Sequence, residues 1–364
     1  MPLPSARVRR TESLLAHWHD GRLAFLNFAQ RRVAAADALA IPFLDFFGRW
    51  RTVQDAIQHF DAYSTASVRR TIRDLLKLGL LVTESSPEAD LDHRIAAAWS
   101  AWLPEGALHF ATKDAPYVRM NWSRRRLMAA LPDTPQPAKI KTLRGADRLE
   151  LPPVDLPDSE FVNVLRARRT HRQFSRQAVP LETVSRLLAL VWGYTGYLDS
   201  EFFGKLPRRT SPSAGARHPG EVYLMALRVE GLEPGLYHYH SARHRLEVVR
   251  RQASQAQASR YCAHQDYAGN AAALFLMTAV FPRTMWKYHR PRAYRVVLLD
   301  AGHLAQTFCL MATWLGLAPF CTAALKDTLI EKDLGIDGVR ESILYVLGVG
   351  QPAKATKSKR DFVL

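Results

Sequence analysis

The sequence predicts an α+β protein with a small N-terminal domain and a larger domain of helices and a mostly antiparallel sheet. Three observations support this prediction. A chain of 364 residues has room for two domains. Segments with the spacing of amphipathic helices are interspersed with short apolar runs typical of strands. Residues 132–157 are rich in proline, as in a linker or an arm that wraps a partner.

Residues 1–90 predict a winged-helix-like domain. Asp20-Gly21 lies between two apolar runs and predicts a hairpin turn. Helices are expected at three places where apolar residues recur at helical spacing: over Ala38–Phe47, after a cap at Thr52, and after a cap at Ser64 or Thr65. Gly79 is expected to end the last helix, and Leu80–Val82 to continue as a strand.

Residues 91–158 predict a partly helical segment followed by the proline-rich linker. Four aromatic side chains in this segment are expected to pack on the next domain: Trp99, Trp102, His109 and Phe110. At the other end of the chain, residues 353–364 are expected to form a basic tail.

Residues 159–352 predict the larger domain. Asp158 or Ser159 is expected to cap its first helix, and Leu181–Trp192 has the spacing of a second. A long helix is expected over Tyr294–Leu317. Strands are expected at five apolar runs: Glu221–Val229, Leu236–Tyr239 and Leu246–Val249 as a meander, Ala271–Val280 as a buried strand, and Ser342–Gly348.

The chain is strongly basic, with a formal net charge of +16 and a pI near 10.0. Such a surface favours an anionic partner, for example nucleic acid, an acidic peptide, a phosphorylated cofactor or a membrane face, or it serves solubility alone. The arginines are scattered along the chain, and no tract is basic enough to predict a nucleic-acid-binding tail.

Other features favour a cytoplasmic protein without a membrane span. No run of about 18 apolar residues is present, and the basic start lacks the apolar stretch of a secretory signal. The three cysteines, Cys262, Cys309 and Cys321, lack metal-ligand spacing and fit a reducing compartment. His238 and His240 alternate on a predicted strand, but no familiar ligand pattern accompanies them, so no metal is expected.

Four short motifs carry the candidate chemistry, and the first is Arg168-Arg169-Thr170-His171-Arg172. In an extended segment, the side chains of Arg168, Thr170 and Arg172 point the same way and could hold a phosphate. The same cations would also suit the C-terminal end of a helix.

The second motif is Pro212-Ser213-Ala214-Gly215. Small residues let a backbone approach a flat ring closely, and backbone N–H groups can bond the edge of that ring. An ordinary turn would have the same composition.

The third motif is Lys287-Tyr288, directly after the predicted buried strand. A lysine beside a tyrosine stabilises a phenolate, and a partly desolvated lysine is itself a base, although a snorkelling lysine is the plain alternative. The fourth motif, Asp300–His303, is expected to open a helix, where an aspartate is favourable. His303 is expected to be structural.

In order and spacing, these motifs resemble those of the nitroreductase-like flavin enzymes, and among them the streptolysin-type (SagB-type) dehydrogenases that mature azole-containing peptides. That family carries Arg-Arg-Ser-x-Arg, and Thr170 keeps the hydroxyl of the serine. The family's Pro-x-Glu-Val-Tyr run is matched by Pro219–Tyr223. The resemblance covers residues 159–352 well, and the first 90 residues only in the general type of domain.

The resemblance implies a bound FMN and a two-fold homodimer with the flavin at its interface. It also implies the residues of the site: Arg168, Arg169, Thr170 and Arg172 on the phosphate, Pro212, Ser213, Ala214 and Gly215 along the ring, and Lys287 and Tyr288 in catalysis. Two segments depart from the family. Arg217-His218 replaces bulkier apolar residues near the substrate, and Phe320–Leu325 lacks the glycines usual near the phosphate.

The implied function is an FMN-dependent dehydrogenase that oxidises thiazoline or oxazoline rings of a ribosomal precursor peptide, with a cyclodehydratase as a further partner. One alternative is an NAD(P)H-dependent flavin reductase of dehydroamino acids or small molecules. Another is a DNA-binding regulator with a flavin-sensing domain, whose basic helix face would meet phosphates through Arg69, Arg70, Arg73 and Lys77. The N-terminal domain is expected instead to bind a leader peptide as an added strand, or only to pack.

Overall fold

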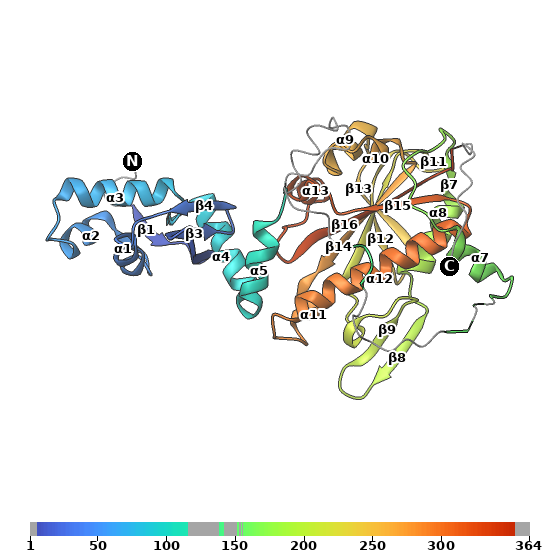
Figure 1. Cartoon of the computed structure of the whole chain (residues 1–364), viewed down its shortest axis with the longest axis horizontal. Coiled ribbons are helices and arrows are strands. Elements are labelled where there is room, and N and C mark those ends of the chain that lie inside the picture. Colours follow the sequence, from blue (N-terminus) through green and yellow to red (C-terminus); the bar gives the residue numbers. More distant parts are fainter. Residues whose placement is uncertain (1–5, 116–137, 142–150, 153, 155, 354–364) are drawn as a thin grey trace.

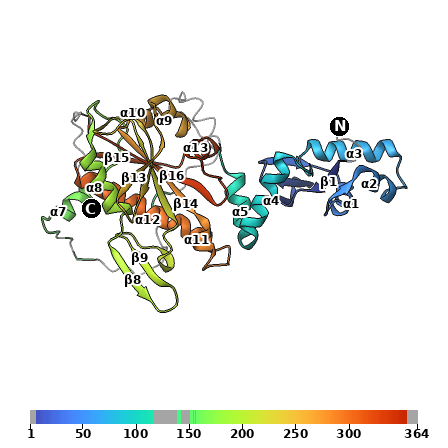
Figure 2. The same cartoon turned by 180° about the vertical axis from the view of Figure 1, so that it is seen from behind.

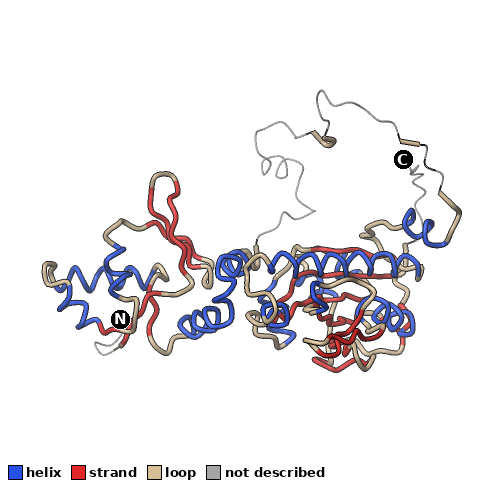
Figure 3. The backbone as a smooth tube through the Cα atoms, turned by 90° about the horizontal axis from the view of Figure 1, so that it is seen from below, coloured by secondary structure: helices blue, strands red, loops and turns tan. Residues whose placement is uncertain are grey.

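The computed structural model describes residues 6–115, 138–141, 151–152, 154 and 156–353 (Figure 1). A small N-terminal domain and a larger domain are joined by two helices, α4 (Pro87–Trp99) and α5 (Leu103–Ala111), as Figure 2 shows from behind and Figure 3 from below. The predicted boundary at residue 90 falls inside α4. Most of the predicted linker, and the tail beyond residue 353, lie outside the described residues.

The N-terminal domain combines three helices with two three-stranded antiparallel sheets. The helices are α1 (Ala40–Phe46), α2 (Val53–His59) and α3 (Thr65–Lys77). One sheet has the order β5 (Arg51–Thr52), β1 (Arg7–Arg10), β6 (Leu81–Thr83), and the other β2 (Leu14–His19), β3 (Arg22–Asn27), β4 (Arg32–Ala35). The domain is thus richer in strands than the winged-helix prediction specified, because β1, β4 and β5 were not predicted.

Local sequence signals explain the elements that were predicted here. The hairpin of β2 and β3 turns at Asp20-Gly21, and both residues have positive φ. Thr52 and Asp55 form a capping box at the start of α2. Ser64 caps α3 by accepting a hydrogen bond from the backbone N–H of Ser67.

The larger domain is built on a six-stranded sheet whose neighbours are all antiparallel, which confirms the predicted α+β class. Its strands, in spatial order, are β13 (Arg245–Arg250), β12 (Gly235–His240), β10 (Gly220–Ala226), β14 (Ala273–Val280), β16 (Glu341–Gly350) and β15 (Ala318–Thr322). The central strand β14 is apolar on both faces because helices cover both sides of the sheet.

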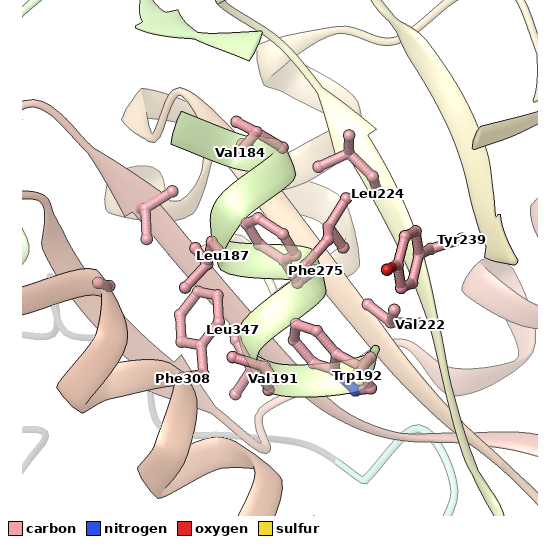
Figure 4. Packing of buried hydrophobic residues seen from close by; sticks show 14 of the residues in the cluster. Val184, Leu187, Val191, Trp192, Val222, Leu224, Tyr239, Phe275, Phe308 and Leu347 are labelled. Carbon is pink, nitrogen blue, oxygen red and sulfur yellow. The ribbon is translucent and has the colours of Figure 1, made fainter. Parts of the chain in front are cut away.

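One face of the sheet packs against α8 (Leu181–Trp192) and α12 (Ala293–Trp314). Figure 4 shows Leu187, Val191 and Trp192 of α8 directed at Phe275 and Phe308, and the rings of Trp192 and Phe275 stack. The other face packs against three shorter helices: α9 (Gln255–Tyr261), α10 (Asp266–Asn270) and α13 (Asp327–Leu334).

The remaining elements frame this core. A hairpin of β8 (Gly196–Ser200) and β9 (Gly204–Arg208) projects from the domain (Figures 1 and 2) and was not predicted. Ser159 caps α7, as expected. The short elements are α7 (Glu160–Ala167), α11 (Phe281–Met285), the 3-10 turns Ser100–Trp102 and Ala214–Ala216, and a parallel pair of β7 (Val179–Pro180) and β11 (Val229–Glu230).

Aromatic side chains of α4 and α5 dock onto the larger domain, as predicted. The indole N–H of Trp99 donates to the carbonyl of Val339, and that of Trp102 to the carbonyl of Tyr288, both at 2.9 Å. His109 hydrogen-bonds the hydroxyl of Tyr294 at 3.0 Å. These contacts hold the connecting helices against the segment that carries the Lys-Tyr motif.

Helix α12 is an exception to the expectation that no segment could span a membrane. By length and composition it is apolar enough to do so. In the structure its buried Leu304 and Phe308 pack against the sheet and α8, and its buried Val297 packs in the cluster around Trp99 and Trp102. This is the arrangement of a core helix.

Candidate active site

The loop that carries Pro212–Gly215 connects β9 to β10 and is fixed onto α12. Ser213 donates a hydrogen bond to the carboxylate of Asp300 at 2.5 Å, and the backbone N–H of His218 donates to Ser213 at 2.9 Å. Gly215, Ala216 and His218 all have positive φ, between 44° and 59°. A loop with three left-handed residues needs such side-chain anchors.

Asp300 is buried and lies in the middle of α12, not at its start. The prediction that Asp300–His303 opens a helix was wrong, because α12 already begins at Ala293. Burial raises the pKa of Asp300, while hydrogen bonds from Ser213 and the backbone of Ala214 act in the opposite direction. Its function here is to hold the loop, and His303 is exposed.

The structure brings the Lys-Tyr motif to the same loop. A Cβ atom added to Gly215 would lie 2.7 Å from both Lys287 Nζ and Tyr288 Oη. The two functional groups therefore converge on Gly215, which leaves room for them by having no side chain. The hydrogen bond from Trp102 to the carbonyl of Tyr288 fixes the backbone of the motif.

Aromatic and cationic side chains surround Lys287. Its ammonium group lies 4.4 Å from the ring centroid of Phe203, at the tip of the β8–β9 hairpin. The Arg217 guanidinium lies 5.4 Å from the rings of both Phe203 and Trp286. Phe203 and Trp286 have no local sequence signal for this role, because only the fold brings the hairpin to α11.

His218 is buried next to this cluster and holds the hairpin to the loop. Its Nε2 lies 3.0 Å from the carbonyl oxygen of Pro207, and the Arg283 guanidinium donates to the backbone carbonyl of His218. Burial, with the nearby charge of Arg209, lowers the pKa of His218 to about 4. At neutral pH it is therefore uncharged, and Nε2 donates its proton to Pro207.

The Arg168–Arg172 segment runs along the edge strand β15, where the backbone N–H of His171 donates to Pro319. The charge of Arg168 acts on Cys309 and Cys321, on the face of the sheet covered by α12. Arg172 instead lies 5.7 Å from the ring of Tyr267, which packs in the cluster on the opposite face. The structure thus does not direct these two guanidinium groups to one point.

The cations of this segment have no acidic partner among the described residues. Arg169 donates only to the carbonyls of Arg166 and Arg168, and Thr170 is exposed. Among the ion pairs formed by the described residues, none involves Arg168, Arg169 or Arg172. Arg168, Arg169 and Thr170 are therefore available to a phosphate, whereas Arg172 is directed at Tyr267 on the other face.

The two candidate halves of a flavin site both lie beside α12. Arg168 is near Cys309, and Ser213 bonds Asp300, nine residues earlier on the same helix. At 1.5 Å per residue the two positions are about 14 Å apart along the axis. FMN, whose ribityl chain separates its phosphate from its ring, needs two such separate sites.

Of the two histidines considered for metal binding, His238 has other partners, whereas the buried Nδ1 of His240 has no hydrogen-bond partner among the described residues. His238 lies between the carboxylates of Glu221 and Glu247, at 3.0 and 3.2 Å. His244 hydrogen-bonds Tyr239 and Ser185. In the described part of the chain, no group of three or more histidine, cysteine or acidic side chains is placed to hold a metal ion.

Comparison with known proteins places this site in context. A family model described as the nitroreductase family matches residues 165–351, which include all four motifs. The trifolitoxin-processing protein TfxB of Rhizobium leguminosarum bv. trifolii is 24% identical over 308 residues, 81% of this chain and 82% of TfxB.

Two further similarities involve microcin proteins of Escherichia coli. The microcin B17-processing protein McbC is 30% identical over 135 residues, which cover 36% of this chain and 49% of McbC. The structure of the microcin synthetase McbBCD complex with truncated pro-MccB17 bound aligns with a TM-score of 0.47 and 20% identity. That alignment covers 66% of this chain and 86% of the matched chain.

Proposed function

Since the chain belongs to the nitroreductase family, we propose that it is an FMN-dependent dehydrogenase that matures a ribosomally made peptide. The peptide substrate is supported by two relatives, TfxB and McbC, whose names describe the processing of trifolitoxin and of microcin B17. The described site residues support the redox part of the proposal.

Two groups of residues would hold FMN. The phosphate would meet the cations and hydroxyl of Arg168, Arg169 and Thr170, and Arg172 would join them by turning away from Tyr267. The edge of the ring would meet the backbone of Pro212, Ser213, Ala214 and Gly215, which Asp300 holds in place. When bound, FMN supplies hydride transfer.

The observation that carries the proposal is the convergence of Lys287 and Tyr288 on Gly215. It places a proton acceptor beside the loop that would line the flavin ring. A thiazoline or oxazoline becomes an aromatic azole by losing a hydride and a proton, and Lys287 or Tyr288 would take the proton. Arg217, Phe203 and Trp286 would form the wall on the substrate side.

Mass spectrometry of a precursor peptide tests the direction of the reaction. Incubation of an azoline-containing peptide with FMN-loaded protein should remove two hydrogens per ring. A gain of two hydrogens by a dehydrated peptide in the presence of NADPH would establish the reductase alternative instead. A protein that stays colourless after reconstitution with FMN would overturn both.

We also propose that the N-terminal domain binds the leader of the substrate peptide. Strand β4 forms an edge of its sheet, and Val33 on it is 69% exposed. A groove of about 380 Å³ lies beside it between α1 and α3, lined by Phe43, Phe60, Tyr63 and Leu75 among others. An extended peptide added to β4 would place apolar side chains in this groove.

Binding of a fluorescent precursor peptide, with and without its leader, tests this assignment. Removal of the leader should weaken binding at least tenfold. Tight, sequence-dependent binding of double-stranded DNA that falls steeply with salt would favour the regulator alternative, in which the exposed face of α3 meets phosphates. The expected protein partner is a cyclodehydratase, which would form the azoline in the preceding reaction.

A second copy of the chain is proposed to complete the flavin site. Exposed apolar side chains lie along α12 and on α7, which contacts the C-terminal end of α12: Leu298, Leu299, Trp314, Phe161 and Leu165. The two helices are adjacent, since the indole of Trp314 donates to Glu160 at 2.8 Å. This face flanks both halves of the candidate site, so a two-fold contact here would supply the missing wall of the ring.

A further inference from the structure

Two cysteines that have no role in the proposed reaction lie in contact beside Arg168. Cys309 is on α12 and Cys321 on the edge strand β15, and their sulfur atoms are 3.3 Å apart. A disulfide bond is about 2.04 Å long, so closing it requires a movement of little more than 1 Å. Cys309 is buried and Cys321 is half-buried, so small solutes can approach the pair from the β15 side.

We propose that Cys309 and Cys321 form a redox-active dithiol, which a hydroperoxide converts into an intramolecular disulfide. The pair has a function of its own in this proposal, because neither sulfur belongs to the residues that would bind FMN or move the proton. A cytoplasmic dithiol of this kind is reversible and acts as a sensor or a relay more often than as a structural bridge.

The surroundings of the two sulfurs favour the reaction. The thiol of Cys321 donates a hydrogen bond to Cys309 and lowers the pKa of the Cys309 thiol, and the charge of Arg168 acts in the same direction. Tyr345 donates a hydrogen bond to Cys321. We therefore assign Cys309 as the attacking sulfur, which a small hydroperoxide would reach past the half-buried Cys321, and Cys321 as the resolving one.

Cys262 provides an internal comparison. It is fully buried, and burial raises the pKa of its thiol to about 12. Almost none of it is thiolate at neutral pH, and the thiolate is the reactive form. The same peroxide should therefore leave Cys262 unchanged.

The reaction balances without further reagents. The Cys309 thiolate attacks the terminal oxygen of the hydroperoxide, so that an S–O bond forms, the O–O bond breaks, and the alkoxide leaves and takes a proton. Cys321 then attacks the Cys309 sulfur, the S–S bond forms, and water leaves with the oxygen and the Cys321 proton. Overall, two thiols lose two electrons and two protons, and the hydroperoxide becomes an alcohol and water.

The new bond would link α12 to β15 next to the candidate phosphate site. It would also remove the thiolate form of Cys309, which would compete with a phosphate for Arg168 wherever it forms. Oxidation is therefore expected to strengthen FMN binding roughly threefold to tenfold, a modest effect for one partly screened charge. This consequence rests on the proposed function, whereas formation of the disulfide does not.

The experiment uses the full-length protein, reduced and desalted, and then treated with hydrogen peroxide. Thiols titrated after unfolding should fall from three to one, and a non-reducing peptide map should contain the Cys309 peptide linked to the Cys321 peptide. Cys262→Ser should still lose two thiols. Cys321→Ser should instead trap a sulfenic acid on Cys309, detectable as a dimedone adduct.

Absence of the linked peptide in peroxide-treated wild-type protein, or oxidation of Cys262 at the same rate, would overturn the proposal. FMN titration of the reduced and oxidised forms then tests the effect on the cofactor. Equal affinities would refute the link to Arg168, and failure of both forms to bind FMN would refute the proposed function while the disulfide result stands.

Discussion

At the scale of single residues, the candidate site depends on what Gly215 leaves empty. A side chain there would occupy the space of Lys287 Nζ and Tyr288 Oη and would add strain to a residue with φ of 59°. The hydrogen bond between Ser213 and Asp300 fixes the same loop to α12. The glycine and the two functional groups therefore form one unit, in which each position limits the others.

The Lys-Tyr pair is predicted to act in chemistry and not in cofactor binding. Lys287→Ala and Tyr288→Phe should keep the flavin absorbance while turnover falls by roughly 10²–10⁴, the usual contribution of a general base. Lys332→Ala, on the exposed side of α13, is the matched control and should turn over normally. Normal turnover by both Lys287→Ala and Tyr288→Phe would make the pair structural.

Arg172 is predicted to show the opposite pattern. Its guanidinium lies over Tyr267 and has no carboxylate partner among the described residues, and Arg172→Ala removes one proposed phosphate contact. The variant should be purified with less flavin, and excess FMN should restore part of its activity. Arg176→Ala, a nearby exposed arginine, should keep its flavin. Equal FMN affinity of the Arg172 variant and wild type would remove Arg172 from the site.

His218 is predicted to make the protein sensitive to acid. Its folded pKa is lowered to about 4, against about 6.5 in the unfolded chain, so the unfolded state binds more protons between these values. Stability must therefore fall as the pH falls from about 6.5 towards 4. His218→Gln, which can still donate to Pro207, should show a smaller loss over this range in urea unfolding at several pH values. An identical pH dependence in both proteins would contradict the assignment.

At the scale of elements, the sequence was most informative where a cap or a regular spacing marked an end. Thr52, Ser64 and Ser159 located three helix starts, and α8 coincides with the predicted Leu181–Trp192. These signals are local, because they depend on backbone groups within one turn.

The elements that were missed have no such local signal. Strand β15 is short, contains Pro319 and lies at the sheet edge, so its sequence looked like a glycine-poor loop. The β8–β9 hairpin is exposed although it carries Tyr197, Leu198 and Phe202, and its contact with Lys287 depends on tertiary structure. For the same reason the sequence identified both parts of the Gly215 cluster but could not show that they meet. Asp300 offered one usable signal, an aspartate within an apolar helix.

The docking of α5 depends on a buried ion pair between its end and the larger domain. Lys113 lies 2.7 Å from Glu331 and also donates to the carbonyl of Gly338, and both charged side chains are nearly inaccessible. Lys113→Met leaves a buried carboxylate unpaired and should lower the free energy of unfolding by about 3–5 kcal/mol. The double variant Lys113→Met/Glu331→Leu should recover most of this loss.

The exposed pair Arg31–Asp114 is the control for that measurement. It joins the N-terminal domain to the end of α5 at 2.9 Å, but both side chains remain partly in solvent. Arg31→Met should therefore change the free energy of unfolding by less than about 1 kcal/mol in the same denaturant experiment. If Lys113→Met and Arg31→Met lowered the free energy of unfolding equally, burial would not determine how much an ion pair contributes to the docking.

At the scale of the whole molecule, α12 connects the separate parts of the proposal. Asp300 holds the ring-side loop, Cys309 lies by the phosphate-side arginine, and Val297 and Phe308 pack in the core. The opposite side of the same helix carries exposed apolar side chains. If a second copy covers that outer side, a substitution there should therefore weaken FMN binding.

Assembly and flavin binding are accordingly predicted to fail together. Leu299 is 60% exposed on α12, and Leu299→Glu would place a charge in the proposed two-fold contact without disturbing the core. Sedimentation velocity should show a dimer for wild type and a monomer for the variant, and the monomer should lose FMN because one wall of the ring is missing. Leu39→Glu, an equally exposed leucine of the N-terminal domain, should remain a flavin-loaded dimer. A wild-type monomer that retains FMN would refute the shared site, since one copy would then enclose the ring alone.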